Sequence, residues 1–251
     1  MASHSQGLSA PLAPAFTGRN GLLDKYFYFA MAVLIAIITT YGFHFTILSN
    51  LVEAAVPRPW IVWVHATVFT TWLVLFVVQS GLVRLRRVSW HRTLGWLGLV
   101  MGGAMPLLGC ATAIVMDRFR FQRLHADPTY EANFLILQLN DMLLFTVFFG
   151  LAALWRKKPQ LHWRLMLIAT WGLTSAAFGR FPSAAISNVY FYVLIDLFIS
   201  LGVVRDLLID RRIHPVYRYA VPALAMEQFF VMFTYLHTLP WWTPIGQAML
   251  R

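Results

Sequence analysis

The chain has 251 residues, of which 59% are hydrophobic and only 12% are charged. Because a soluble domain normally carries about 25% charged residues, much of this chain is expected to lie in lipid rather than in water. The 20 Lys and Arg residues outnumber the 10 Asp and Glu residues and fall in short clusters between apolar runs, a pattern that orients membrane helices and excludes a nucleic-acid-binding domain.

The N-terminal segment differs from the rest of the chain. Residues 1–25 are polar and contain Pro and Ser, without the apolar core and small-residue cleavage site of a signal peptide. We expect them to form a disordered cytoplasmic tail. The one cysteine, Cys110, lies in an apolar run, so no disulfide framework is expected.

Apolar segments long enough to cross a bilayer follow this tail, since about 20 helical residues span the hydrocarbon core. They lie at 26–49, 59–83, 93–116, 133–155, 165–187, 190–209 and 219–237. This spacing predicts an all-α polytopic membrane bundle of seven transmembrane helices, forming a single domain over residues 26–240. Residues 241–251 are expected to be a short extracytoplasmic tail.

The positive charges predict the orientation of this bundle. On one side, Lys and Arg number two in the N-terminal tail and four in each of the hinges 84–92, 156–164 and 205–218, fourteen together, against five on the other side. Because basic loops stay in the cytoplasm, we expect a cytoplasmic N-terminus and a C-terminus outside. The localisation expected is the inner membrane of a bacterium.

Each of these three hinges also carries a histidine, at His91, His162 and His214. In one interpretation Arg and Lys hold the hinge inside and the histidine is tolerated at the interface. In the other, the imidazoles converge on a cytoplasmic metal or haem site, since histidine is a common ligand of both.

Ionisable residues within the apolar segments are costly unless paired, and each is a candidate functional residue. Asp141, Arg180, Asp196 and Glu227 are predicted near the midplane or in the outer half of the membrane. Arg180 can neutralise one carboxylate and bind a second through its planar fork, and Asp141 and Asp196 are the expected partners. This buried polar cluster is interpreted either as an ion-pair network that fixes helix packing or as a ligand or proton pathway.

One face of the segment at 59–83 combines polar and aromatic side chains at helical spacing. Its members are His65, Phe69, Trp72, Phe76 and Gln79. This face suits packing against a flat ring and equally suits ordinary helix packing. His65 and His91 lie at opposite membrane faces, more than about 20 Å apart by helix rise, so they cannot bind one iron.

These segments resemble known sequences. The stretch HATVFTTWLVLFVVQSGLVRLRRVSWHRTLGW, with DMLLF and RKKPQLHWRLMLIAT further on, resembles uncharacterised bacterial multi-helix membrane protein families known as domains of unknown function. The likeness covers residues 60–170. A more distant likeness is to membrane proteins of cytochrome oxidase maturation, such as haem A synthase, and to transmembrane b-type cytochromes.

The resemblance implies an accessory protein of respiratory or haem metabolism. It would bind haem or a quinone-like ligand in the outer half of the bundle, with a respiratory complex as a possible partner besides lipid. The candidate cofactor-binding residues are His65, Trp72, Gln79, His91 and His162. The alternatives are a small transporter or proton-coupled carrier that uses the buried Asp/Arg cluster, and a membrane scaffold without ligand.

Overall fold

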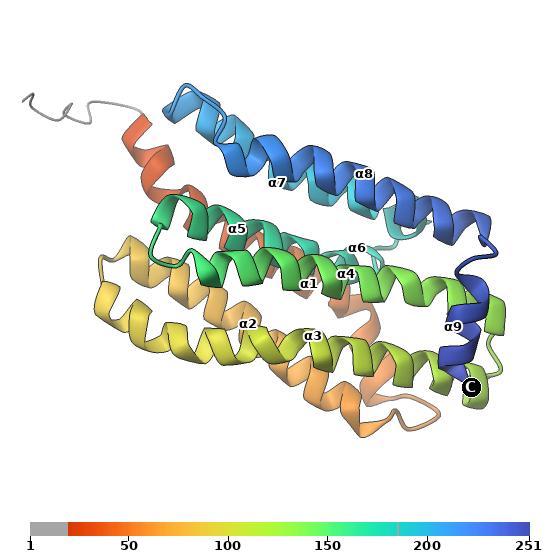
Figure 1. The fold of residues 1–251 in the computed structure, drawn as a ribbon. Helices are drawn as coiled ribbons and strands as arrows, with labels where there is room; N and C mark the ends of the chain where they lie inside the picture. Colours follow the sequence, from red (N-terminus) through yellow and green to blue (C-terminus); the bar gives the residue numbers. More distant parts are fainter. Residues whose placement is uncertain (1–19, 185) are drawn as a thin grey trace, which may run out of the picture.

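A computed structural model of the chain describes residues 20–184 and 186–251, and these residues are helical or lie in short connections (Figure 1). Two single π-helical turns, η1 (Leu48–Val52) and η2 (Ile186–Tyr190), accompany the α-helices. The α-helices are α1 (Asn20–Ile47), α2 (Trp60–Arg84), α3 (Val88–Leu124), α4 (Pro128–Leu154), α5 (Pro159–Gly172), α6 (Ser175–Phe178), α7 (Phe191–Ile209), α8 (Pro215–His237) and α9 (Thr243–Leu250). The expected all-α class is therefore confirmed.

Proline residues begin several of these helices. Pro128, Pro159 and Pro215 stand at the starts of α4, α5 and α8, where the missing N–H costs nothing. Asp127 caps α4, because its side chain accepts hydrogen bonds from the main-chain N–H groups of Thr129 and Tyr130. These local signals explain why the turns between long helices are short.

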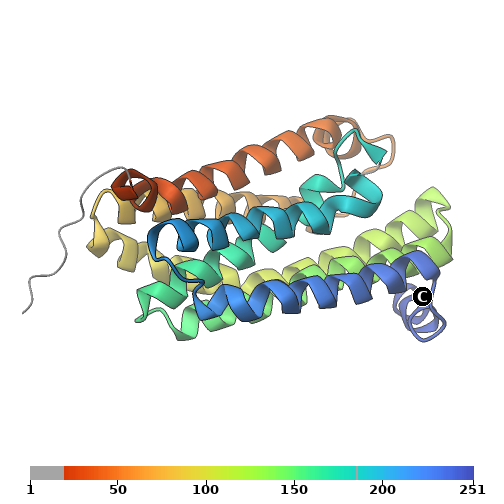
Figure 2. The same ribbon diagram turned by 90° about the horizontal axis from the view of Figure 1, so that it is seen from above.

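The long helices run alongside one another and alternate in direction (Figures 1 and 2). The start of α1 and the α2–α3, α4–α5 and α7–α8 connections lie together at one end of the bundle. We call this the hinge end, and the opposite end, where α9 lies, the far end. The basic hinges predicted from the sequence are thus gathered at the hinge end.

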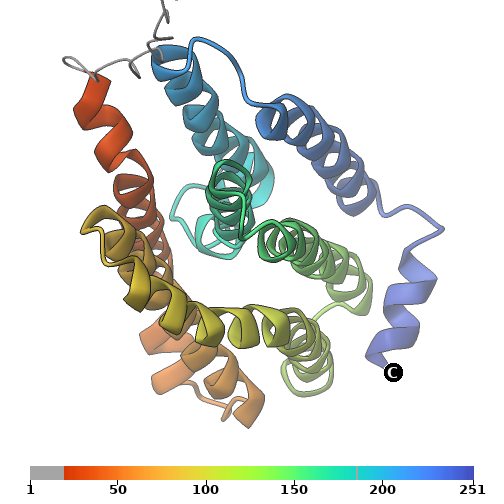
Figure 3. The ribbon, with the colours of Figure 1, turned by 60° about the vertical axis from the view of Figure 1, so that its left-hand side comes forward.

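Helix α5 occupies the middle of the bundle (Figure 3). It packs against α1, α4, α7 and α8, and its residues from Arg164 to Leu165 and from Leu167 to Trp171 are buried. The core around it includes Ile35 of α1, Leu135 of α4 and Ile195 of α7, each at most 1% exposed. Because other helices surround α5, its Arg164 is fully buried in protein and not exposed to solvent.

Glycines allow close helix contacts, and two of them lie in α1 and α3. A Cβ at Gly42 of α1 would collide with the carbonyl oxygen of Ala177 in α6, and one at Gly102 of α3 would collide with the ring of Phe149 in α4. The small side of α3 at Gly102 thus brings this helix close to α4. Gly103, its neighbour, faces open space.

Five helices of the described residues are long and apolar enough to cross a membrane. They are α1, α2, α3, α4 and α8. Helix α5 has only 14 residues, and the apolar sequence of α7 contains the charged residues Asp196, Arg205 and Asp206. The chain is therefore a multi-pass helical protein suited to a bilayer.

Several predicted boundaries differ from the structure. The helix expected at 93–116 extends over Val88–Leu124, and α1 begins at Asn20, inside the segment expected to be a tail. The segment expected at 165–187 breaks after Gly172 into α6 and η2. Hydropathy averages over a window and so misses both polar helix extensions and short breaks.

Candidate functional site

The carboxyl group of Asp141 lies among hydroxyl groups. Asp141, in the middle of α4, accepts hydrogen bonds from Ser175 Oγ and from the Tyr192 hydroxyl, the latter at 2.9 Å. Ser175 begins α6 and Tyr192 lies in the first turn of α7, and both are buried. No Lys or Arg of the described chain lies within ion-pair distance of Asp141, so hydroxyl groups alone satisfy this carboxyl.

Further polar groups continue from this carboxyl towards α8. The Asn140 amide lies 3.4 Å from the Tyr192 hydroxyl and 3.5 Å from Glu227 Oε2. When the Gln228 amide is turned so that its nitrogen faces Asp196, this nitrogen donates to both carboxylate oxygens of Asp196, at 3.1 and 3.2 Å. Three of the four residues predicted to cluster, Asp141, Asp196 and Glu227, thus occupy neighbouring parts of α4, α7 and α8.

Arg180 does not make the predicted ion pair with Asp141 or Asp196. It lies in the connection after α6, donates to the Ala176 carbonyl oxygen and places its guanidinium 4.4 Å from the ring centre of Phe43. The helix that should have carried Arg180 inwards ends at Phe178. The side chain is consequently exposed on the isolated bundle, and the carboxylates lack the cation that the sequence led us to expect.

The predicted face of α2 points partly into the bundle. The His65 ring stacks on Phe69 at 4.0 Å between ring centres, and Trp72 packs edge-on against Phe145 and Phe149 of α4. His65 Nδ1, Trp72 Nε1 and Gln79 Oε1 are buried without a hydrogen-bond partner in the described chain. Such unsatisfied atoms normally mark an additional bound group or water.

Two of the three hinge histidines come together. The rings of His91 in α3 and His162 in α5 have centres 6.5 Å apart at an interplanar angle of 75°. His214 serves a different purpose, because its Nδ1 accepts the main-chain N–H of Val216 at 3.2 Å and so caps α8. The structure therefore brings together two of the three imidazoles of the convergence interpretation, while the third is held by the start of its own helix.

His214 lies between helices, and its environment disfavours the charged imidazolium. Burial lowers the pKa of His214, and the nearby Arg164 guanidinium lowers it further. The neutral ring is the form whose Nδ1 can cap α8, so local electrostatics and capping agree.

The largest ionic cluster of the described residues lies at the hinge end and was not predicted from the sequence. Arg164 of α5 pairs with Asp206 and Asp210 of α7, and Arg205 pairs with the same two residues and with Asp24 of α1. These residues lie near the ends of apolar segments, where only the arginines were counted, as charges that orient the bundle. The available signal was the mixture of positive and negative residues at these positions, which is typical of ion pairs.

A second ionic cluster lies towards the far end. Arg120 binds both Asp117 and Glu131, and Gln138 donates to both oxygens of Asp117 at 2.8 and 3.1 Å. Asp117 and Glu131 are almost fully buried. This cluster joins α3 to α4 and has a cation of its own, in contrast to Asp141.

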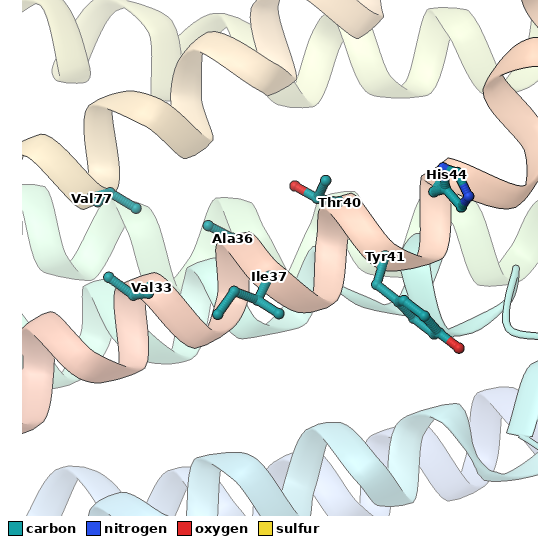
Figure 4. A pocket seen from close by; sticks show the side chains of 7 residues that line it. All are labelled: Val33, Ala36, Ile37, Thr40, Tyr41, His44 and Val77. Carbon is teal, nitrogen blue, oxygen red and sulfur yellow. The ribbon is translucent and has the colours of Figure 1, made fainter.

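The surface of α1 carries an open groove that extends to α2 (Figure 4). The groove has a volume of about 510 Å³. Its lining is mostly apolar, with polar atoms only at one end, and consists of Val33, Ala36, Ile37, Thr40, Tyr41, His44 and Val77. We assign no chemistry to this surface.

Neither metal clusters nor relatives define the site further. Among residues 20–184 and 186–251, no three or more His, Cys, Asp and Glu side chains are grouped to hold a metal ion. The chain matches no family model, no curated protein and no solved structure.

Proposed function

We propose that the chain crosses the inner membrane of a bacterium seven times, with its N-terminus in the cytoplasm. The gathering of the three basic hinges at one end of the bundle supports this topology. Helices α5 and α7 would cross the membrane packed largely against other helices. Their charged side chains can lie there because they are ion-paired and face protein rather than lipid.

Within this topology, we propose that the protein is a proton-coupled carrier whose titrating group is Asp141. The observation that carries the proposal is a carboxyl group that receives two hydroxyl hydrogen bonds and, within the described residues, no cation. A proton on this carboxyl removes the cost of an unpaired charge, and its release requires contact with water or another base. Binding and release of a proton would therefore be linked to changes in helix packing around Asp141.

The neighbours of Asp141 are suited to pass this proton on. Hydroxyl groups both donate and accept, so Tyr192 and Ser175 can bind either form of the carboxyl. Asn140 and Glu227 extend the chain of polar groups from α4 to α8. Glu227 would be the second proton-binding group.

The test is proton movement in proteoliposomes that contain a pH-sensitive dye and carry an imposed membrane potential. Small organic anions and cations are added outside one at a time, because the transported solute is unidentified. We expect at least one solute to cause proton entry that is absent from empty liposomes and is abolished by Asp141→Asn.

Asp127→Asn is the matched control, since asparagine also caps a helix and the change lies at the far-end start of α4. It should retain full proton entry. Proton entry that survives in the Asp141→Asn protein, or vesicles indistinguishable from empty ones with every solute, would refute the proposal.

A second candidate is a binding protein for a flat ligand, haem or a quinone, in an accessory role in respiratory or haem metabolism. The unpartnered buried atoms of His65, Trp72 and Gln79 favour it. Because Phe145 and Phe149 already pack on Trp72, the ring would have to lie nearer His65. An absorption spectrum of the purified protein tests the haem form of this candidate. We expect a Soret band that shifts on reduction and that is lost in His65→Ala but kept in His44→Ala.

A further inference from the structure

We infer that His91, His162 and the side-chain amide of Gln79 form a binding site for a transition-metal ion at the hinge end of the bundle. These side chains come from the first turn of α3, the first turn of α5 and the last turns of α2. The site is separate from Asp141 and does not depend on the proposed proton-coupled role.

The tautomer of His162 is determined by a main-chain contact. Its Nδ1 lies 2.9 Å from the carbonyl oxygen of Ala152. A carbonyl can only accept, so Nδ1 carries the hydrogen and Nε2 keeps a lone pair. Histidine ligands of metals are oriented in this way, by a second nitrogen that donates to a carbonyl or carboxylate.

His91 supplies a second unsatisfied ring nitrogen. Its Nδ1 is buried without a hydrogen-bond partner in the described chain. The neutral tautomer with its hydrogen on Nε2 leaves a lone pair on Nδ1 that can bind a cation.

Gln79 supplies a third unsatisfied acceptor. Its Oε1 is buried without a partner in the described residues, and its Nε2 lies 3.8 Å from where a Cβ on Gly95 would be. Gly95 is one turn beyond His91 in α3, so the amide lies against the turn that carries this histidine.

A group of acceptors without a donor is suited to a cation and not to an anion. Ring centres 6.5 Å apart are close to the largest separation that two nitrogen–metal bonds of about 2.0–2.1 Å allow, so a tetrahedral ion would draw the two rings about 1 Å closer together. The ligands are neutral and the hinges around them are basic, which disfavours Mg²⁺ and Ca²⁺, ions that require carboxylate oxygens. Imidazole ligands instead favour Zn²⁺, Cu²⁺ or Ni²⁺.

The experiment uses Zn²⁺ as the probe and the full chain in detergent, first stripped with a chelator. Isothermal titration should give one Zn²⁺ per chain. His91→Ala and His162→Ala should each weaken binding by at least about 100-fold, the upper end of the loss caused by removing a supporting partner, and Gln79→Ala by about 10-fold. His214→Ala, which removes the third hinge histidine, should leave binding unchanged.

A spectrum of the unaltered protein provides a test that does not depend on the folding of variants. Bound Cu²⁺ should show electron paramagnetic resonance coupling to two imidazole nitrogens. Absence of stoichiometric Zn²⁺ binding, a Cu²⁺ signal with fewer than two nitrogens, or equal binding in a folded His91→Ala/His162→Ala double variant would overturn the inference.

Discussion

Arg164 and Asp206 form a two-pronged ion pair in the protein interior. Arg164 Nε and Nη2 donate to the two carboxylate oxygens of Asp206 at 3.1 and 2.6 Å, and neither side chain has exposed surface. Arg164 also donates to Gln160, and Asp206 also accepts from Arg205 at 2.8 Å. The pair thereby joins the central helix α5 to α7, and further hydrogen bonds satisfy the other polar atoms of both side chains.

Removing one partner of this pair should be severely destabilising. We expect Asp206→Ala to lower the free energy of unfolding by about 3–5 kcal/mol, because it leaves the fully buried Arg164 guanidinium with only the half-exposed carboxylate of Asp210 to balance its charge. Unfolding by sodium dodecyl sulfate in mixed micelles measures the loss. The double variant Arg164→Met/Asp206→Leu should recover much of it, whereas additive losses in a double-mutant cycle would mean that the pair is not coupled.

Close contact between α1 and α6 should depend on Gly42. The change Gly42→Ala places a methyl group against the main chain of α6, which cannot move aside as a side chain can. We expect a loss of about 1–3 kcal/mol in unfolding free energy. Gly103→Ala is the control, because its methyl group meets open space and an alanine within a helix should stabilise by about 0.4–1 kcal/mol. Equal effects of the two substitutions would argue against close α1–α6 packing.

The cap of α8 should make stability depend on pH. The unfolded chain binds a proton at His214 near pH 6.5, and the folded chain does so only at lower pH, because burial lowers the pKa of His214. The unfolded state therefore holds more protons in this range, and stability should fall as the pH drops below about 6.5. His214→Asn keeps a cap without titration, so its melting temperature should fall less between about pH 7.5 and about pH 5. An identical decline in both proteins would exclude His214 as a cause.

The proposed topology predicts where fused reporters lie. A reporter after Arg251 should behave as periplasmic and one inserted after Lys158 as cytoplasmic, since Lys158 lies at the hinge end and α9 at the far end. Active alkaline phosphatase only in the first fusion, and fluorescent protein only in the second, would be the expected pattern. Both reporters on one side would require an even number of crossings between these two positions.

The partners of the buried ionisable residues were only partly predictable. Hydropathy and helix rise located Asp141, Asp196 and Glu227 along their helices, and the structure brings them into neighbouring positions. The predicted partner Arg180 is wrong, because the break after Gly172 changes the direction of the chain before this residue. Distance along a helix follows from sequence, but the direction in which a side chain points depends on how each helix is rotated against its neighbours.

The sequence by itself determined the all-α class, the approximate extent of the long helices and the gathering of basic hinges at one end, because these follow from apolar length and alternating direction. Only the tertiary structure decided that His91 meets His162 while His214 caps α8, and that Asp141 is satisfied by Ser175 and Tyr192. Those contacts join helices far apart in the chain. Their geometry depends on helix rotation and on side-chain packing, which neither hydropathy nor charge counts contain.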